Sequence, residues 1–167
     1  MEIGISLGSN LGDRLENLRR ARDRLAALEG VKVAACSRVY ETEPVDVRAA
    51  HRGKAFLNAV LIVESALTPR ALAGALWKIE AAMGRVRETD RNAPRPIDLD
   101  IVYAGDETIC EADLRVPHPR WTKRRFVVQP LAEVRPERVL PGETRRVNEV
   151  LDALPERPWA RVFEEAW

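Results

Sequence analysis

The chain has 167 residues, a length typical of one domain with a single hydrophobic core. Hydrophobic residues make up 46% of it and charged residues 32%, which excludes an intrinsically disordered chain. Lysine and arginine total 27 against 26 acidic residues, giving a formal net charge of +1, and this excludes the strong positive field of a protein that coats nucleic acid. We therefore expect residues 1–167 to form one domain in which any anion binding depends on local clusters of charge.

The first part of the chain predicts a strand, a helix and a second strand. Residues 3–7 alternate as a short strand does, and glycine, serine and asparagine follow them as turn residues. Asp13 with Glu16 three residues later is typical of a helix N-terminus, and Gly30 is placed to end that helix. Residues 31–42 predict one strand, which stops where a proline cannot donate a ladder hydrogen bond.

The middle of the chain predicts a buried strand, a helix and an acidic strand. Residues 56–64 are nearly all apolar, which is typical of a central strand covered on both faces. Thr68 followed by proline predicts a helix that ends at Gly84. Residues 97–103 predict the acidic strand, and a Gly-Asp turn leads into a short partner strand at 108–110. Two polar loops are expected between these elements, at residues 45–54 and 85–96.

This order of elements predicts the α+β class. The first four strands and two helices give β-α-β-β-α-β, the arrangement of a ferredoxin-like core, and a doubly wound sheet is the alternative. The remainder predicts a C-terminal elaboration with a proline-flanked loop around His118, a helix over 127–134 and a last amphipathic helix with apolar residues at Val147, Val150, Leu151 and Leu154.

The cysteine content and the hydropathy pattern give the expected location. Cys36 and Cys110 are far apart and lack the close spacing of a zinc site or a disulfide framework, so we expect core thiols in a reducing compartment. No apolar run approaches the roughly 20 residues of a membrane span, and the N-terminus lacks the features of a signal peptide. We expect a cytoplasmic protein with no membrane partner.

Asp98 and Asp100 are the most informative pair in the sequence. They lie two residues apart in the acidic strand, so strand alternation aims both carboxylates at one face. One interpretation is a half-exposed strand whose acids face water. The other is a site for a hard divalent cation, since like charges this close repel one another without a counterion. Oxygen ligands without a neighbouring cysteine or histidine favour Mg²⁺ over zinc.

An arginine cluster lies just before this strand, with Arg85, Arg87, Arg91 and Arg95 within eleven residues. It fits a solvated loop, and it also fits a loop that captures a polyphosphate through bidentate hydrogen bonds. Binding of RNA is a further use of such a cluster, but aromatic residues make up only 5% of the chain and few lie nearby to stack on bases. Acids for a metal beside guanidinium groups for phosphate favour chemistry on a nucleoside triphosphate.

Three other polar residues are open to two readings. His118 lies between two prolines and before several basic residues, so it is either structural or a phosphate-contacting imidazole. Asn58 lies in an apolar strand and must find hydrogen-bond partners in the backbone or in a polar heterocycle. Glu80 lies at the margin of a buried helix stripe, where it is either a boundary residue or reaches a ligand.

Taken together, these motifs resemble the 6-hydroxymethyl-7,8-dihydropterin pyrophosphokinase family, which transfers pyrophosphate from ATP to a pterin hydroxymethyl group. The resemblance extends from residue 1 to about residue 140. The motifs that carry it are Gly8-Ser9-Asn10, Tyr40-Glu41-Thr42-Glu43-Pro44, Phe56-Leu57-Asn58-Ala59-Val60, Ile79-Glu80, Gly84-Arg85-Val86-Arg87, Pro94-Arg95-Pro96-Ile97-Asp98-Leu99-Asp100-Ile101, Val116-Pro117-His118-Pro119, and Arg124, Phe126 and Pro130-Leu131.

The resemblance implies a role for particular residues. Two Mg²⁺ ions would be held by Asp98 and Asp100. The catalytic residues would be Arg85, Arg95, Asp98 and Asp100. ATP would lie against Glu80, Arg85, Arg87, Arg95, Ile101, His118 and Arg124. The pterin would lie against Thr42, Pro44, Val45, Phe56, Asn58, Asp98 and Phe126.

The predicted function is therefore an ATP-dependent pyrophosphokinase of folate biosynthesis that releases AMP. Its partners would be ATP, Mg²⁺ and the pterin, without nucleic acid, and the length is compatible with a monofunctional monomer. A non-catalytic ferredoxin-like module that binds phosphate or RNA is the alternative from a different class. An ordinary γ-phosphoryl kinase is a third reading, and it differs in releasing ADP.

Overall fold

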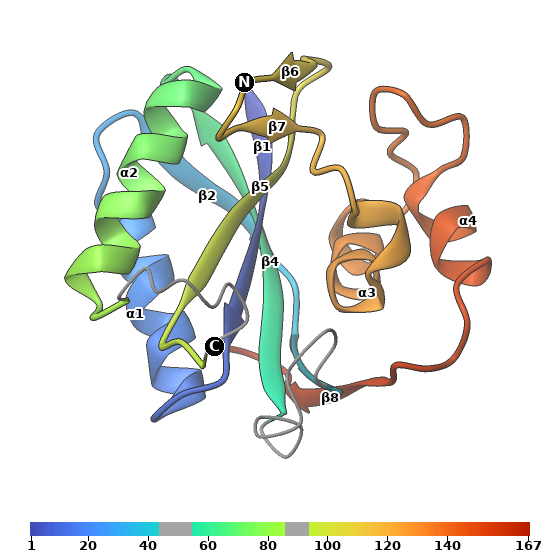
Figure 1. The fold of residues 1–167 in the computed structure, drawn as a ribbon, viewed down its shortest axis with the longest axis horizontal. Coiled ribbons are helices and arrows are strands. Elements are labelled where there is room, and N and C mark those ends of the chain that lie inside the picture. Colours follow the sequence, from blue (N-terminus) through green and yellow to red (C-terminus); the bar gives the residue numbers. More distant parts are fainter. Residues whose placement is uncertain (44–54, 86–93) are drawn as a thin grey trace.

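The computed structural model describes residues 1–43, 55–85 and 94–167, which form an α+β fold with one large antiparallel sheet (Figure 1). Its strands are β1 (Glu2–Ser9), β2 (Val31–Cys36), β3 (Val39–Thr42), β4 (Phe56–Ser65), β5 (Asp98–Ala104), β6 (Ile109–Cys110), β7 (Arg115–Val116) and β8 (Ala160–Glu164). Its helices are α1 (Arg14–Ala26), α2 (Pro69–Ala82), the short 3₁₀ helix η2 (Trp121–Lys123), α3 (Arg125–Val134) and α4 (Val147–Asp152).

The apolar strand β4 lies at the centre of the sheet, as its composition predicts. The strand order is β5-β1-β4-β3-β8, and β2 pairs with β4 beside β3. All of these pairs are antiparallel. In the part of the chain that the structure describes, the acidic strand β5 is therefore an edge strand of this sheet, paired with β1, and it also contacts α2 and β7.

The two long helices begin where the sequence predicts. The Asp13 carboxylate accepts a hydrogen bond from the Glu16 amide at 3.0 Å, which caps α1. The Thr68 hydroxyl accepts one from the Ala71 amide at 3.2 Å, and Pro69 occupies the first turn of α2. These caps satisfy backbone donors that have no partner within the helix.

Helices cover both faces of the sheet. α1 and α2 pack on one face, where their leucines meet apolar side chains of β1, β4 and β5 in the larger of two buried clusters. α3 and α4 lie on the other face, over Val60, Ile62 and Val102 (Figure 1). None of the helices in the described ranges is long and apolar enough to cross a membrane.

Three details differ from the sequence-based expectations. The single strand predicted over 31–42 is two strands, because the backbone breaks at Ser37, whose hydroxyl accepts from the Val60 amide at 2.9 Å. The short strand β6 pairs with β7 and not with the acidic strand. Cys36 and Cys110 are exposed and not core thiols, because β2 leaves alternate side chains in solvent and β6 is a surface hairpin strand.

The C-terminal elaboration contains three short elements that the sequence did not predict, which are β7, η2 and β8. The helix expected over 127–134 is α3, and the last amphipathic helix is the short α4, with Val147 and Val150 buried. Beyond it the chain returns across the molecule to form β8 at the edge of the sheet beside β3 (Figure 1).

Candidate active site

The register of the sheet gathers three predicted site residues around Gly8. Gly8 on β1 is paired with Asn58 on one side and with Asp98 on the other. Residues that face one another in adjacent strands point to the same face of a sheet. An added Cβ at Gly8 would lie 3.0 Å from Asn58 Oδ1, 3.9 Å from Phe56 Cδ1 and 3.9 Å from Asp98 Cβ. The absence of a side chain at Gly8 therefore opens the space between Asn58, Phe56 and Asp98.

Asn58 has a defined orientation. Its Nδ2 donates a hydrogen bond of 2.7 Å to the Thr42 hydroxyl, and the two residues are 5% and 2% exposed. A buried amide needs such a partner, so this contact fixes which end of the amide faces Gly8. Thr42 is in turn paired with Phe56 in the β3–β4 ladder. Thr42, Phe56 and Asn58 thus form one compact group on the face that carries Asp98.

Asp98 lies between two arginines. Its Oδ1 accepts a hydrogen bond from Arg85 Nη1 at 2.5 Å, and its Oδ2 lies 3.2 Å from Arg95 Nη2. Arg95 is held through its backbone, since its amide donates to Asn10 Oδ1 at 2.9 Å and its carbonyl accepts from the Asn10 amide at 3.3 Å. Two guanidinium groups therefore contact one carboxylate, that of the first residue of β5.

Glu80 on α2 binds both Arg85 and the backbone of β5. It is 2% exposed, near the end of α2, and its Oε1 accepts a hydrogen bond from the Leu99 amide at 2.7 Å and another from Arg85. Burial raises the pKa of the Glu80 carboxyl, and the charge of Arg85 opposes that effect. Since Leu99 separates the two aspartates, Glu80 fixes the strand segment that presents them.

Asp100 faces a cavity of about 240 Å³ between α2 and the loop that follows β7. Burial, followed by the charges of Asp98 and Glu80, raises the pKa of Asp100 to about 7. Within residues 1–43, 55–85 and 94–167 its carboxylate makes no hydrogen bond or ion pair. None of the described residues thus occupies either of its oxygens, and the charges of Arg124 and Arg85 act on it through space.

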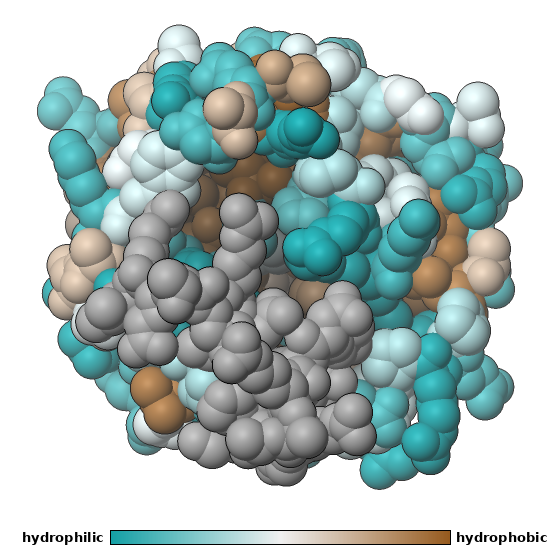
Figure 2. Space-filling model, viewed as in Figure 1, coloured by the Kyte–Doolittle hydropathy of each residue, from teal (hydrophilic) through white to brown (hydrophobic). Residues whose placement is uncertain are grey.

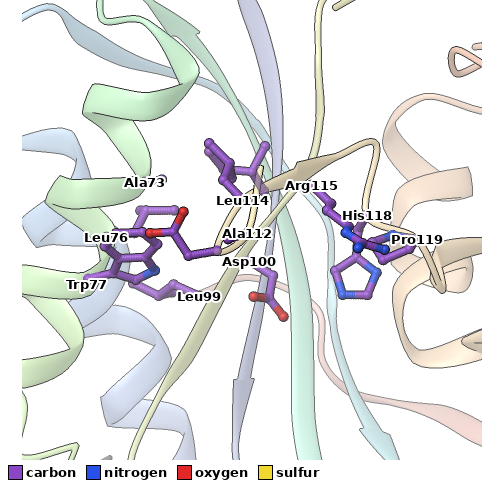
Figure 3. Close-up of a pocket in the computed structure, with 12 residues that line it drawn as sticks. Ala73, Leu76, Trp77, Leu99, Asp100, Ala112, Leu114, Arg115, His118 and Pro119 are labelled. Carbon is purple, nitrogen blue, oxygen red and sulfur yellow. The ribbon is translucent and has the colours of Figure 1, made fainter. Parts of the chain in front are cut away.

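The cavity has an apolar side and a polar side. Ala73, Leu76 and Trp77 from α2 form one wall, and His118 and Pro119 form the opposite one, with the Asp100 carboxylate between them (Figure 3). Arg70 braces the Trp77 side, because it lies 5.6 Å from the Trp77 ring centroid and makes a bidentate pair with Asp113. In the space-filling view, an apolar hollow opens near the centre of this face of the molecule (Figure 2).

His118 is set in a basic environment. Its Nδ1 accepts a hydrogen bond from the Arg120 amide at 3.1 Å, and its Nε2 lies 3.3 Å from Arg124 Nη1. Burial and these two arginines lower the pKa of His118 to about 4. The ring is therefore neutral at pH 7, with one nitrogen beside the Arg120 amide and the other beside the Arg124 guanidinium. The His118 amide donates to the Val102 carbonyl at 2.9 Å, which attaches this loop to β5.

The remaining predicted residues occupy different positions. Ile101 is 5% exposed and lines the cavity beside Asp100. Arg124 lies 5.3 Å from the centroid of the Phe126 ring at the start of α3. Phe126 packs against the apolar cluster beneath that helix. Pro44, Val45 and Arg87, together with most of the two expected polar loops, lie outside the described residues.

Sequence reasoning did not assign a role to Gly8, Asn10 or Trp77. The first two stand in the quoted Gly8-Ser9-Asn10 motif, which is the signal that could have identified them. Trp77 sits at the edge of a helical apolar stripe, a position that predicts core packing equally well. In the described ranges, no group of three or more histidine, cysteine, aspartate or glutamate side chains is arranged to hold a metal ion.

Comparisons with known proteins agree on one family. Residues 4–136 match the model of the 7,8-dihydro-6-hydroxymethylpterin-pyrophosphokinase (HPPK) family. A 2-amino-4-hydroxy-6-hydroxymethyldihydropteridine pyrophosphokinase of Methylorubrum extorquens is 40% identical over 142 residues, which are 85% of this chain and 87% of that protein. The folic acid synthesis protein fol1 of Schizosaccharomyces pombe is 38% identical over 151 residues, which cover 90% of this chain.

Some of these relatives are much longer. The chain spans 20% of the S. pombe protein and 27% of a folate synthesis bifunctional protein of Arabidopsis thaliana. Among solved structures, Plasmodium falciparum HPPK-DHPS resembles this fold with a TM-score of 0.69 at 15% identity, over 90% of this chain and 43% of that one. This likeness supports the fold, while the sequence matches carry the relationship.

Proposed function

The chain belongs to the 7,8-dihydro-6-hydroxymethylpterin-pyrophosphokinase family, whose members are pyrophosphokinases of folate synthesis, and on that premise we propose its reaction. It transfers pyrophosphate from ATP to the hydroxymethyl oxygen of 6-hydroxymethyl-7,8-dihydropterin and releases AMP. The observation that supports this proposal is the pairing of Gly8 with both Asn58 and Asp98. It sets the amide that we propose for binding the heterocycle beside the carboxylate that we propose for holding metal and phosphate.

The aspartates fit Mg²⁺ by the chemistry of their donors. Asp98 and Asp100 supply carboxylate oxygens from one face of β5, and those of Asp100 are not engaged by other described residues. Mg²⁺ prefers oxygen ligands and is commonly held by one or two carboxylates together with substrate phosphates. We propose that these two residues hold two Mg²⁺ ions. When bound, the ions would neutralise the triphosphate and help align it for attack at the β-phosphorus.

The cavity beside Asp100 suits the nucleotide. Its apolar wall of Leu76 and Trp77 offers contact to a base. Its polar wall carries the His118 imidazole, and the Arg124 guanidinium next to that ring is a donor for a phosphate oxygen. Arg85 and Arg95 are already at Asp98, so their guanidinium groups are close enough to exchange part of that contact for triphosphate oxygens. This arrangement supports their proposed role in stabilising negative charge during transfer.

The group around Asn58 suits the pterin. Because its Nδ2 is engaged by Thr42, the Asn58 Oδ1 is the atom that points toward the open space at Gly8. The pyrimidine edge of a pterin carries N–H groups, and an amide oxygen accepts hydrogen bonds from such groups. Phe56 borders the same space and offers a face for stacking, and Phe126 with Arg124 is the proposed contact from the side of α3. Pro44 and Val45 remain proposed contacts by family resemblance.

We also infer a ferredoxin-like core. The order β5-β1-β4 with β2 and β3 at the far side supports a β-α-β-β-α-β unit in which β2 and β3 together stand for one strand. On this reading residues 1–167 are one pyrophosphokinase unit, to which α3, α4 and β8 are added.

A product assay tests the proposed function. The purified chain would be incubated with ATP, Mg²⁺ and 6-hydroxymethyl-7,8-dihydropterin, and the nucleotides separated by chromatography. We expect AMP, and only when the pterin is present. ADP would instead indicate a γ-phosphoryl kinase. No turnover together with salt-sensitive affinity for RNA would indicate a binding module.

A further inference from the structure

The C-terminal strand β8 reaches the pterin side of the proposed site. It pairs with β3, and its first residue, Ala160, is the register partner of Thr42. Thr42 is the residue whose hydroxyl accepts from Asn58 Nδ2 at 2.7 Å. A strand 118 positions later in the chain, beyond the residues that match the family model, therefore borders the group that would read the pterin.

Trp159, just before β8, is joined to Glu43, just after Thr42. The Glu43 amide donates to the Trp159 carbonyl at 3.2 Å, and the Trp159 amide donates to Glu43 Oε2 at 3.1 Å. Arg157 adds a contact of 3.4 Å to Glu43 Oε1. The pairing of β3 with the C-terminal segment thus continues one residue past Thr42. There the backbone amide and the side-chain carboxylate of Glu43 both bind the backbone of Trp159.

Phe163 on β8 connects the C-terminal segment to the start of β4 through Arg14. It lies 5.7 Å from the Arg14 guanidinium carbon, measured at its ring centroid. Arg14 Nη1 donates to Glu41 Oε1 at 3.0 Å and to the Ala55 carbonyl at 2.8 Å. Ala55 directly precedes Phe56 on β4. The C-terminal segment therefore braces β3 through Glu43 and β4 through Arg14.

We propose that residues 159–163 are a positioning element for the pterin and that Glu43 is the positioning residue through which this element acts. The inference rests on the proposed function. Without β8, β3 would be an edge strand with unpaired backbone groups at Thr42, and the Thr42–Asn58 contact would lose its support. The aspartate strand β5, on the proposed ATP side, is held separately by Glu80. Loss of residues 159–163 should therefore change the binding of the pterin and leave that of ATP unchanged.

The test compares Glu43→Ala with Glu43→Gln in the full chain. The alanine removes the acceptor for the Trp159 amide, and the glutamine keeps an oxygen there. We expect Glu43→Ala to raise KM for the pterin about tenfold, the value of one hydrogen bond to a charged group. KM for ATP and kcat should change by less than about twofold, and Glu43→Gln should restore most of the affinity. Glu107→Ala, an exposed glutamate in the β5–β6 turn, is the matched control.

Phe163→Ala keeps the proposal testable if Glu43→Ala folds poorly, because Phe163 is 47% exposed. It should raise KM for the pterin in the same selective way, by about threefold. Equal changes in both KM values, or no change in either variant, would overturn the proposal.

Hydrogen exchange separates this inference from the proposed function. The amides of Thr42 and Asn58 should exchange faster in Glu43→Ala than in the wild type or in Glu107→Ala, whether or not the chain turns over ATP. Unchanged exchange at these amides would overturn the positioning role. If the wild type shows no turnover and the amides still exchange faster in Glu43→Ala, the proposed reaction is wrong. The positioning role of residues 159–163 and Glu43 would then still stand.

Discussion

Asn58 and Asp98 flank the same residue, Gly8, from the two strands on either side of it. Their backbones are thus held two strand spacings apart, about 10 Å, by the hydrogen bonds of the sheet. In the proposed reaction this spacing separates the residue that reads the pterin from the residue that handles the triphosphate. The distance between the two substrates would then be set by the rigid core of the protein.

Substitution of Gly8 tests this relationship. Gly8→Ala would place a methyl group 3.0 Å from Asn58 Oδ1, so the amide must move. We expect KM for the pterin to rise about tenfold with the fold retained, because a displaced acceptor loses its hydrogen bond. Gly74→Ala is the matched control, since an added Cβ there meets no atom within 4 Å. It should leave KM unchanged and stabilise α2 by roughly 0.5–1 kcal/mol. Equal effects of the two alanines on KM would contradict the relationship.

The aspartates are tested by Asp98→Asn and Asp100→Asn. Each should lower turnover by about 100-fold or more, because a neutral amide binds Mg²⁺ poorly and leaves phosphate charge less compensated. Mg²⁺ with a non-hydrolysable ATP analogue should raise the Tm of the wild type and not that of Asp100→Asn. The exposed Asp106→Asn serves as the charge control. Wild-type turnover in a folded Asp100→Asn protein would show that the metal assignment is wrong.

The backbone contacts between Asn10 and Arg95 lead to a graded prediction. Arg95→Ala should reduce kcat more than it changes either KM, since its contact strengthens as charge develops during transfer. Asn10→Ala removes the acceptor of the Arg95 amide, so kcat should fall in the same direction by about tenfold. Pre-steady-state measurements would separate chemistry from product release. A variant in which KM alone rises would assign these residues to ground-state binding.

His118 predicts a pH dependence of stability. Its pKa is about 4 in the folded protein and 6.5 when unperturbed. Above pH 6.5 the His118 ring is neutral in both the folded and the unfolded chain, so it adds no pH dependence to the free energy of unfolding. Between pH 6.5 and 4 the unfolded chain takes up a proton that the folded protein does not, so stability falls as the pH falls, by at most about 3 kcal/mol.

Chemical denaturation at pH 7 and pH 4.5 checks this effect. The wild type should lose more free energy of unfolding between the two pH values than His118→Asn, which carries no titrating imidazole. Identical losses in both proteins would contradict the burial of a neutral ring.

Local signals in the sequence predicted most of the core elements. The cap at Asp13 and the Thr68-Pro69 start placed α1 and α2, because capping depends on neighbours within one turn. The apolar run of β4 identified the centre of the sheet, and the alternation around Asp98 gave the shared face of the two aspartates.

The elements that were missed depend on distant partners. β8 pairs with a strand more than 110 residues earlier, and its exposed Val162 and Phe163 give no buried pattern. The break at Ser37 follows from a hydrogen bond to Val60, which no local rule indicates. Trp77 is part of the cavity wall only because β5 lies at the side of the sheet next to α2. These features come from tertiary packing, which a single sequence does not specify.

The most direct test of pyrophosphate transfer by this chain is the fate of the labelled phosphates of ATP. ATP would carry a radioactive label on either the β- or the γ-phosphate, in separate reactions with Mg²⁺ and 6-hydroxymethyl-7,8-dihydropterin. We expect both labels on the pterin product, formed in step with unlabelled AMP. Transfer of the γ label alone, with the β label retained on ADP, would contradict pyrophosphate transfer.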